Sequence, residues 1–245
     1  THNVSSAASD VYKRQAPSWA TSAADETTKT NLTQKGLTDF GTKVIKKMND
    51  LGMMIDVSHS GDQTFWDVIK ISNKPIIASH SSVYSLVNNR RNLKDDQIKA
   101  IAKNGGVIMV NFHPGFIDSS FDKKESAFLE KHTLEVDSLI KNGMDEWNMI
   151  DYLYKKYSDE TEIMRPPLSK LIDHIDYIVK LVGVDYVGLG SDFDGINLTP
   201  LQLDDVTTYP IITKELLNKQ YNREDVVKIL GSNFLRVLEA NELNE

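Results

Sequence analysis

Two histidines stand at the ends of two short apolar runs, and imidazole is both a common metal ligand and a proton carrier. The first run, MMIDVSH, ends in His59, and the second, PIIASH, ends in His80. A third run, YVGLGS, is followed directly by Asp192. Three runs that end in His, His and Asp offer nitrogen and oxygen ligands, which is the donor set that zinc accepts in the absence of sulfur.

Each of these runs has the pattern of a parallel strand that is buried on both faces, with its last residue emerging at the carboxyl end. In a β/α barrel the carboxyl ends of the strands meet at the active site. A single histidine in such a place is adequately explained as the cap of a strand. Two histidines on consecutive strands, with an acidic pair after a later strand, favour a metal site.

The elements that would position these residues alternate along the chain from Gly36 onward. Predicted strands end near His59, His80, Phe112 and Ser191. Apolar residues at helical spacing predict helices over 37–51, 60–71, 95–103, 168–181, 211–218 and 223–241. The stretch 113–167 is polar and less regular, with a helix expected over 128–140. Alternating strands and helices predict a parallel sheet with right-handed crossovers, and four strands make half of a (β/α)₈ barrel.

Composition narrows the class of protein. The 245 residues suit one large α/β domain or two small ones, and 40% of them are apolar, which suffices for a core. The formal net charge of −7 argues against a general nucleic-acid-binding protein. The chain has no cysteine, so any metal must be held by histidine and carboxylate. No apolar run approaches the roughly 20 residues that span a bilayer, so we expect a soluble chain.

Several motifs together resemble the membrane (renal) dipeptidase family of zinc peptidases. The resemblance covers about residues 16–241, and its motifs are specific in this order and spacing. The matching motifs are GLTDFG at 36–41, NDLGMMIDVSH at 49–59, ASHSS at 78–82, NRRNL at 89–93, NGGVIMVNF at 104–112, VGLGSDFDG at 187–195 and ILGSNFLRV at 229–237. The family is described as a (β/α)₈ barrel with a two-zinc centre that hydrolyses dipeptides.

The resemblance implies roles for five residues of this sequence. His59 and His80 would be ligands of one zinc ion. Asp192 would lie beside the metals and act on the scissile region or on the amino group of the substrate, either as a proton carrier or as an anchor. Arg91 would bind the carboxylate of the dipeptide, and His2 resembles a histidine that contacts the substrate carbonyl.

The sequence also departs from the family pattern. The resemblance places a His-x-Asp motif, which binds the first zinc, and a Glu that bridges the two metals ahead of the Thr1-His2 segment, and this chain has no counterpart of either. We therefore expect an N-terminally truncated fragment, the C-terminal half of a (β/α)₈ TIM-type barrel of the metal-dependent hydrolase kind. Such a fragment would bind zinc weakly and hydrolyse dipeptides little, and its true N-terminus and any signal peptide would be missing.

We divide the chain into an irregular N-terminal segment, 1–35, and a partial dipeptidase barrel, 36–245. Within the first part, residues 5–15 (SSAASDVYKRQ) fit no element of the family. They resemble translated adapter sequence, and we expect them to be an artefactual insert. Their removal would bring His2 and Trp19 to the short spacing that the resembled family shows. The alternative is a flexible polar linker.

Other interpretations stay open at this point. The chain is alternatively a non-catalytic half-barrel remnant, or another amidohydrolase-like metal hydrolase, although no metal-binding Lys is evident at a strand end. The remaining histidines carry weaker claims. His113 and His174 have only mild ones, with His174 expected to be a packing or surface residue, and His132 is expected to be exposed. Asp56 is expected to hydrogen-bond a neighbour. The expected partner is a dipeptide. The sequence is compatible with a homo-oligomer. It does not specify the preferred dipeptide or the cellular compartment of the parent protein.

Overall fold

The computed structural model describes residues 19–28, 32 and 34–243. His2 and the expected insert at 5–15 lie outside the described residues, so those two predictions stay untested. No described helix is both long and apolar enough to cross a membrane.

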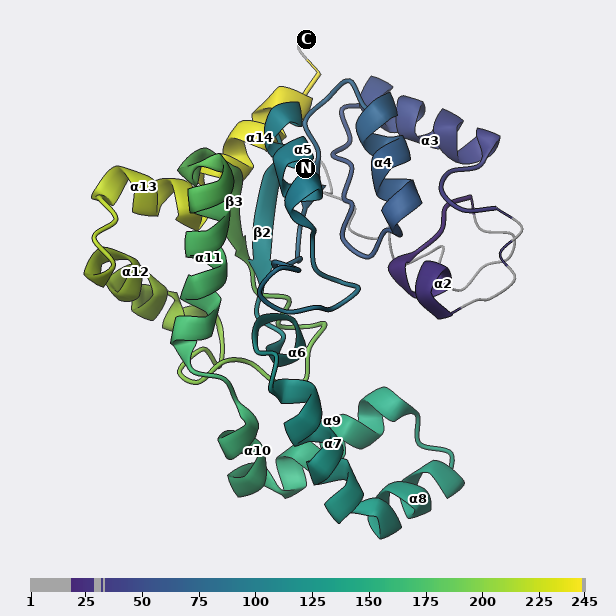
Figure 1. Cartoon of the computed structure of the whole chain (residues 1–245), viewed down its shortest axis with the longest axis vertical. Helices are drawn as coiled ribbons and strands as arrows, with labels where there is room; N and C mark the ends of the chain where they lie inside the picture. Colours follow the sequence, from purple (N-terminus) through teal and green to yellow (C-terminus); the bar gives the residue numbers. More distant parts are fainter. Residues whose placement is uncertain (1–18, 29–31, 33, 244–245) are drawn as a thin grey trace.

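A small parallel sheet lies at the centre of the molecule (Figure 1). Its strands are β1 (Ile77–Ala78), β2 (Val107–Asn111) and β3 (Val187–Gly190), in the order β1-β2-β3. The first predicted strand is reduced to an isolated parallel bridge between Asp56 and Ile77. The order of the four segments is therefore that of the sequence, as expected for successive β/α units.

The two faces of the sheet pack against different helices because side chains alternate along each strand. One face, including Ala78, Val110 and Leu189, belongs to the main core with the helices outside it. The other face, including Ile77 and Val107, packs against the C-terminal helix. The surrounding helices are α2 (Ala23–Thr28), α3 (Asp39–Asp50), α4 (Asp62–Ile71), α5 (Asp95–Asn104), α11 (Leu168–Val182), α12 (Tyr209–Asn218), α13 (Arg223–Val227) and α14 (Asn233–Asn241).

Helix α11 shows why the sequence predicted these helices well. Leu171, Ile175 and Ile178 recur at helical spacing and are fully buried against the sheet and α5. Two short 3₁₀ turns are also present: η2 (Val184–Tyr186) comes directly before β3, and η3 (Val206–Thr208) comes directly before α12. The expected single C-terminal helix is interrupted by a π-helical turn, η4 (Lys228–Ser232), with non-helical backbone at Gly231.

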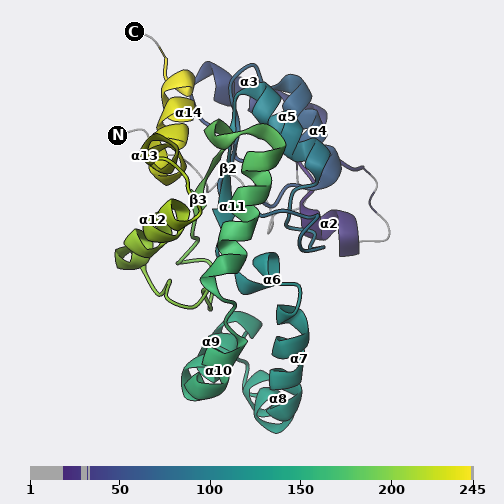
Figure 2. The same ribbon diagram turned by 60° about the vertical axis from the view of Figure 1, so that its left-hand side comes forward.

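The stretch 113–167, expected to be less regular, is largely helical. Figures 1 and 2 show its helices α7–α10 projecting from the end of the body at which the strands terminate. We call residues 121–164 the helical unit. The elements of this stretch are α6 (Pro114–Ile117), α7 (Phe121–Lys131), α8 (Thr133–Lys141), α9 (Glu146–Lys156) and α10 (Ser158–Met164).

The helical unit has a small core of its own, which includes Phe128, Leu153 and Tyr154. The prediction that His132 is exposed is wrong. Its side chain is only 10% exposed, because the ring stacks on Tyr157 with centroids 3.8 Å apart and its Nε2 lies 3.3 Å from Glu160.

Candidate active site

His59 and His80 come together at the carboxyl ends of their segments. The centroids of the two imidazole rings lie 4.9 Å apart, and the rings meet edge to face at 62°. Both line a cavity of about 670 Å³ that also includes Asp192 and Arg91. The structure thus brings together four of the five residues that the sequence singled out. The full lining is His59, Ser79, His80, Arg91, Met109, His113, Phe116, Trp147, Leu189, Gly190, Ser191, Asp192, Gly195 and Ile196.

The backbone at two of these residues is in the left-handed region. His59 has φ of 69° and Asp192 has φ of 58°. Non-glycine residues seldom adopt this conformation, and it is found preferentially at functional sites where surrounding bonds hold it. At His59 the carbonyl oxygen accepts a hydrogen bond from the Ala23 N–H at 2.8 Å, which fixes the turn.

Close packing of the strand ends determines the floor of the cavity. A Cβ atom placed on Gly190 would lie 2.0 Å from the carbonyl oxygen of Ser79 and 3.0 Å from that of Met109. Only glycine allows this approach, since the obstructing atoms belong to the backbone. Gly190 therefore sets how near Asp192 can come to His80.

Asp192 is held by a neighbouring strand. Its Oδ2 accepts a hydrogen bond from Nδ2 of Asn111 at 3.1 Å, and its carbonyl oxygen accepts one from the Gly195 N–H at 2.8 Å. Asn111 is fully buried at the end of β2, and its Oδ1 accepts the backbone N–H of His113. One amide side chain therefore connects the third and fourth strand ends of the site.

Arg91 lies at the wall of the same cavity. Its guanidinium carbon lies 5.5 Å from the centre of the Phe116 ring, and Nη2 is 3.5 Å from the carbonyl oxygen of His80. The Asn89 side chain braces it by accepting the Arg91 backbone N–H at 2.9 Å and donating to the Gly115 carbonyl at 3.3 Å. A planar guanidinium in this position can pair with a carboxylate through two hydrogen bonds.

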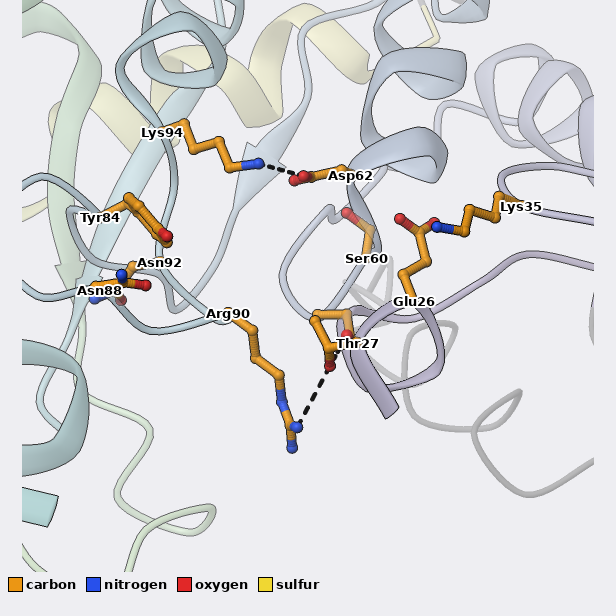
Figure 3. A pocket seen from close by; sticks show the side chains of 11 residues that line it. Glu26, Thr27, Lys35, Ser60, Asp62, Tyr84, Asn88, Arg90, Asn92 and Lys94 are labelled. Atoms are coloured by element: carbon orange, nitrogen blue, oxygen red, sulfur yellow. Dashed lines mark hydrogen bonds and ion pairs between the residues drawn. The ribbon is translucent and has the colours of Figure 1, made fainter. Parts of the chain in front are cut away.

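The adjacent Arg90 points elsewhere. Figure 3 shows it extending toward Thr27 of α2, with Nη1 3.5 Å from the Thr27 hydroxyl. It lines a second cavity of about 310 Å³, in which Lys94 is paired with Asp62. Both arginines also line a cavity of about 650 Å³ that includes His59, but of the two only Arg91 lines the cavity that holds both His59 and His80.

His113 also lines the cavity that holds His59 and His80, although the sequence gave it only a weak claim. Its Nδ1 accepts the Gly115 N–H at 3.0 Å, and its ring lies 4.6 Å from that of Phe116. Burial lowers the pKa of His113 to about 4, and the charge of Arg91 adds to the effect. At neutral pH the imidazole is therefore uncharged, with its proton on Nε2.

Sequence reasoning missed Asn111 and Trp147 as parts of the site. Asn111 carries the same signal as His59 and His80, since it ends the apolar run of β2. Trp147 comes from α9 of the helical unit, and no local pattern connects that helix with the strand ends. His174, expected to be a packing or surface residue, is 1% exposed and therefore packs in the interior, where its Nδ1 accepts the Val83 N–H at 3.0 Å.

The imidazole and carboxylate groups of this cavity are of the types that bind zinc. His59 and His80 supply imidazole nitrogens at a spacing that lets one ion lie between them, because zinc–nitrogen bonds are about 2.0–2.1 Å long. Within residues 19–28, 32 and 34–243, no group of three or more His, Cys, Asp or Glu side chains is arranged to hold a metal ion. His59 and His80 could thus offer two nitrogen ligands, fewer than zinc usually takes.

Comparison with known proteins decides the family. The profile of the membrane dipeptidase family, peptidase family M19, matches residues 11–245. The chain belongs to the membrane dipeptidase family. Among curated proteins, a dipeptidase of Schizosaccharomyces pombe described as uncharacterized is 34% identical over 213 residues, which are 86% of this chain and 41% of that protein.

Solved structures of this family share the fold of the chain. A metallopeptidase from Rhodobacter sphaeroides, liganded with a phosphinate mimic of the dipeptide L-Ala-D-Ala, superposes with a TM-score of 0.65 at 25% identity. That match covers 86% of this chain and 48% of the other. The probable dipeptidase PvdM from Pseudomonas aeruginosa gives a TM-score of 0.65 at 29% identity, covering 84% and 55%. The chain therefore spans about half the length of these members of the membrane dipeptidase family.

Proposed function

We propose that the cavity around His59 and His80 is the C-terminal half of the active site of a zinc-dependent dipeptidase. The observation that carries the proposal is the approach of two imidazole rings to 4.9 Å at adjacent parallel strand ends. Membership of the membrane dipeptidase family supports peptide-bond hydrolysis, and the metallopeptidase relative with a bound dipeptide mimic supports a dipeptide as substrate.

In this proposal His59 and His80 hold zinc through one ring nitrogen each. Bound zinc would polarise the peptide carbonyl and make hydroxide available near neutral pH. Two zinc ions are proposed for the intact site, with the further ligands outside the described residues. The proposed half-barrel places these residues at the carboxyl ends of its strands.

The chain's own residues would bind and orient the dipeptide. Arg91 would pair with its terminal carboxylate, which selects substrates with a free C-terminus. Asp192, fixed by Asn111, would either move a proton or hold the ammonium group of the substrate. His113, neutral at pH 7, would offer an Nε2–H donor without adding charge beside Arg91.

A non-catalytic half-barrel remnant is the second candidate. It is favoured by one observation, that the described residues contribute only two histidines and no third ligand to a metal site. The two candidates predict different affinities for zinc. A remnant would bind zinc no better than two unconnected histidines, whereas half of an active site would bind it through His59 and His80 together.

The test is a zinc titration of the 245-residue chain against a competing chelator, followed by dipeptide hydrolysis assays. We expect weak but specific zinc binding that is lost in both His59→Ala and His80→Ala, and retained in His132→Ala, which removes a histidine of the helical unit. Joining the chain to the upstream segment of a solved relative should then restore turnover. Zinc binding that is the same in all four proteins would contradict the proposal.

A further inference from the structure

A carboxylate, a hydroxyl and an imidazole form a continuous hydrogen-bonded chain behind His80. Ser79 Oγ lies 2.5 Å from Oδ2 of Asp56 and 2.7 Å from Nδ1 of His80. Asp56 comes from the segment that ends in His59, and Ser79 directly precedes His80. The chain therefore connects the segments that carry the two histidines.

The direction of these hydrogen bonds follows from the number of donors around Asp56. Its Oδ1 accepts two backbone N–H groups, those of Ser58 at 2.9 Å and Ser79 at 3.0 Å. Its Oδ2 accepts the Ser79 hydroxyl, which has a single proton to give. Ser79 Oγ must then act as an acceptor toward His80, so the proton of the neutral imidazole is on Nδ1.

We propose that Asp56 and Ser79 are positioning residues that hold His80 in the Nδ1–H tautomer and so make Nε2 its metal-binding nitrogen. The proposal deepens the proposed zinc-dependent function and rests on it for the metal. Metal-binding histidines commonly donate their second ring N–H to an outer partner, which fixes the ring and raises the basicity of the binding nitrogen. Here that partner is a serine backed by a carboxylate.

The same residues also fix the distance between the two histidines. The Ser58 hydroxyl, which is buried next to His59, accepts the backbone N–H of His80 at 3.0 Å. Asp56 holds Ser58 and Ser79 through their backbone N–H groups, so both ends of the pair are tied to one carboxylate. A change at Asp56 would therefore act on His59 and His80 together.

The test is nitrogen NMR of the histidine rings in the metal-free 245-residue chain near neutral pH. Wild-type His80 should show the Nδ1–H form. Asp56→Asn places an amide donor toward Ser79, which reverses the chain and should convert His80 to the Nε2–H form. Ser79→Ala removes the acceptor and should reduce the Nδ1–H population. An Nε2–H form in wild type, or the same tautomer in Asp56→Asn, would overturn the proposal.

A second readout is zinc affinity, measured by competition with a chelator. Loss of an outer partner typically weakens metal binding about 10–100-fold, and we expect this for both variants. Ser120→Ala is the matched control, because it removes a serine hydroxyl that bonds the carboxylate of Asp118 at 2.9 Å. It should leave zinc binding unchanged. An equal loss in the control would show a general effect on folding and contradict the assigned role.

The two readouts separate this inference from the proposed function. If wild-type His80 has the Nδ1–H form but His59→Ala leaves zinc binding intact, the proposed metal site is wrong while the tautomer assignment holds. If zinc binding depends on both histidines but the tautomer does not respond to Asp56→Asn, the site stands and the positioning role fails. Either Asp56→Asn or Ser79→Ala suffices if the other variant does not fold, as judged by its amide spectrum.

Discussion

At the scale of single residues, the site residues that the sequence predicts are mostly those at the ends of predicted strands. His59, His80 and Asp192 were found because each follows a short apolar run. The left-handed backbone at His59 and Asp192 was not predictable from the sequence, since non-glycine residues seldom adopt this conformation and their type does not indicate where they do. Asn111 ends the β2 run in the same way, but an amide does not titrate and is not a usual zinc ligand, so its type alone does not indicate a functional role.

Gly190 is the residue whose substitution should disturb the site most without removing a functional group. Gly190→Ala would place a Cβ against the Ser79 carbonyl, and the strand must move to relieve the contact. Overpacking of this kind costs about 1–3 kcal/mol or more, so urea denaturation should show a lower free energy of unfolding.

Gly143→Ala is the comparison for that measurement, because no atom lies within 4 Å of a Cβ there, although its φ of 83° adds its own strain. We expect altered ring signals of His80 only in Gly190→Ala. Unchanged stability and unchanged His80 signals in Gly190→Ala would show that the strand ends are less closely packed than described.

At the scale of elements, the helices that face the sheet were predictable because their apolar positions recur with the period of a helix, as in α11. The helical unit was predictable only in part, as the helix expected over 128–140, because its helices bury few residues and α8 buries none completely. Its contribution to the site, Trp147, depends on a long-range contact that no local pattern encodes.

Helix α11 is joined to the loop after His80 by a buried histidine, which makes stability depend on pH. Burial lowers the pKa of His174 to about 4 from its usual 6.5. Between these two pH values the unfolded chain binds a proton at His174 and the folded chain does not. The stabilisation is complete above pH 6.5 and is lost as the pH falls toward 4. One such shift amounts to roughly 3 kcal/mol.

Denaturation curves between pH 7 and 4 should therefore show a free energy of unfolding that falls with pH, and a shallower fall in His174→Gln. The change of slope is the informative quantity, because His113 contributes in the same direction. Parallel pH dependences in wild type and variant would contradict the role assigned to His174.

The C-terminal helix α14 is attached to the sheet by Asn233. This buried side chain donates to the carbonyl oxygens of Val184 at 2.7 Å and Val187 at 2.8 Å. Asn233→Ala removes the donor of both hydrogen bonds, and a buried acceptor that loses its partner costs about 1–3 kcal/mol. We expect a fall of a few kcal/mol in the free energy of unfolding by urea, against little change for the exposed Asn218→Ala.

At the scale of the whole molecule, the parallel order of the strand segments was predictable from the alternation of strands and helices, and the structure has that order. The number of residues that pair regularly in each strand was not predictable. β1 contains two residues and the His59 segment only a bridge, because β-structure depends on neighbours that a local pattern does not reveal.

The 245-residue chain alone should turn over dipeptides negligibly, even with added zinc. The two proposed ligands among the described residues are imidazoles, and with these alone carbonyl polarisation and hydroxide delivery would lack a complete centre. An assay with Ala-Ala and excess zinc, next to a full-length member of the family, measures this. Turnover comparable with that of the full-length enzyme would show that the described ligands are sufficient.

The central claim is that His59 and His80 bind the same zinc ion. Crystals of the chain soaked in zinc, measured at the zinc absorption edge, test it most directly. We predict one anomalous peak in the cavity, about 2.0–2.1 Å from a ring nitrogen of each histidine, with Nε2 as the nitrogen of His80. A fully soaked crystal with no peak there, or with zinc bound to only one of the two rings, would contradict the account.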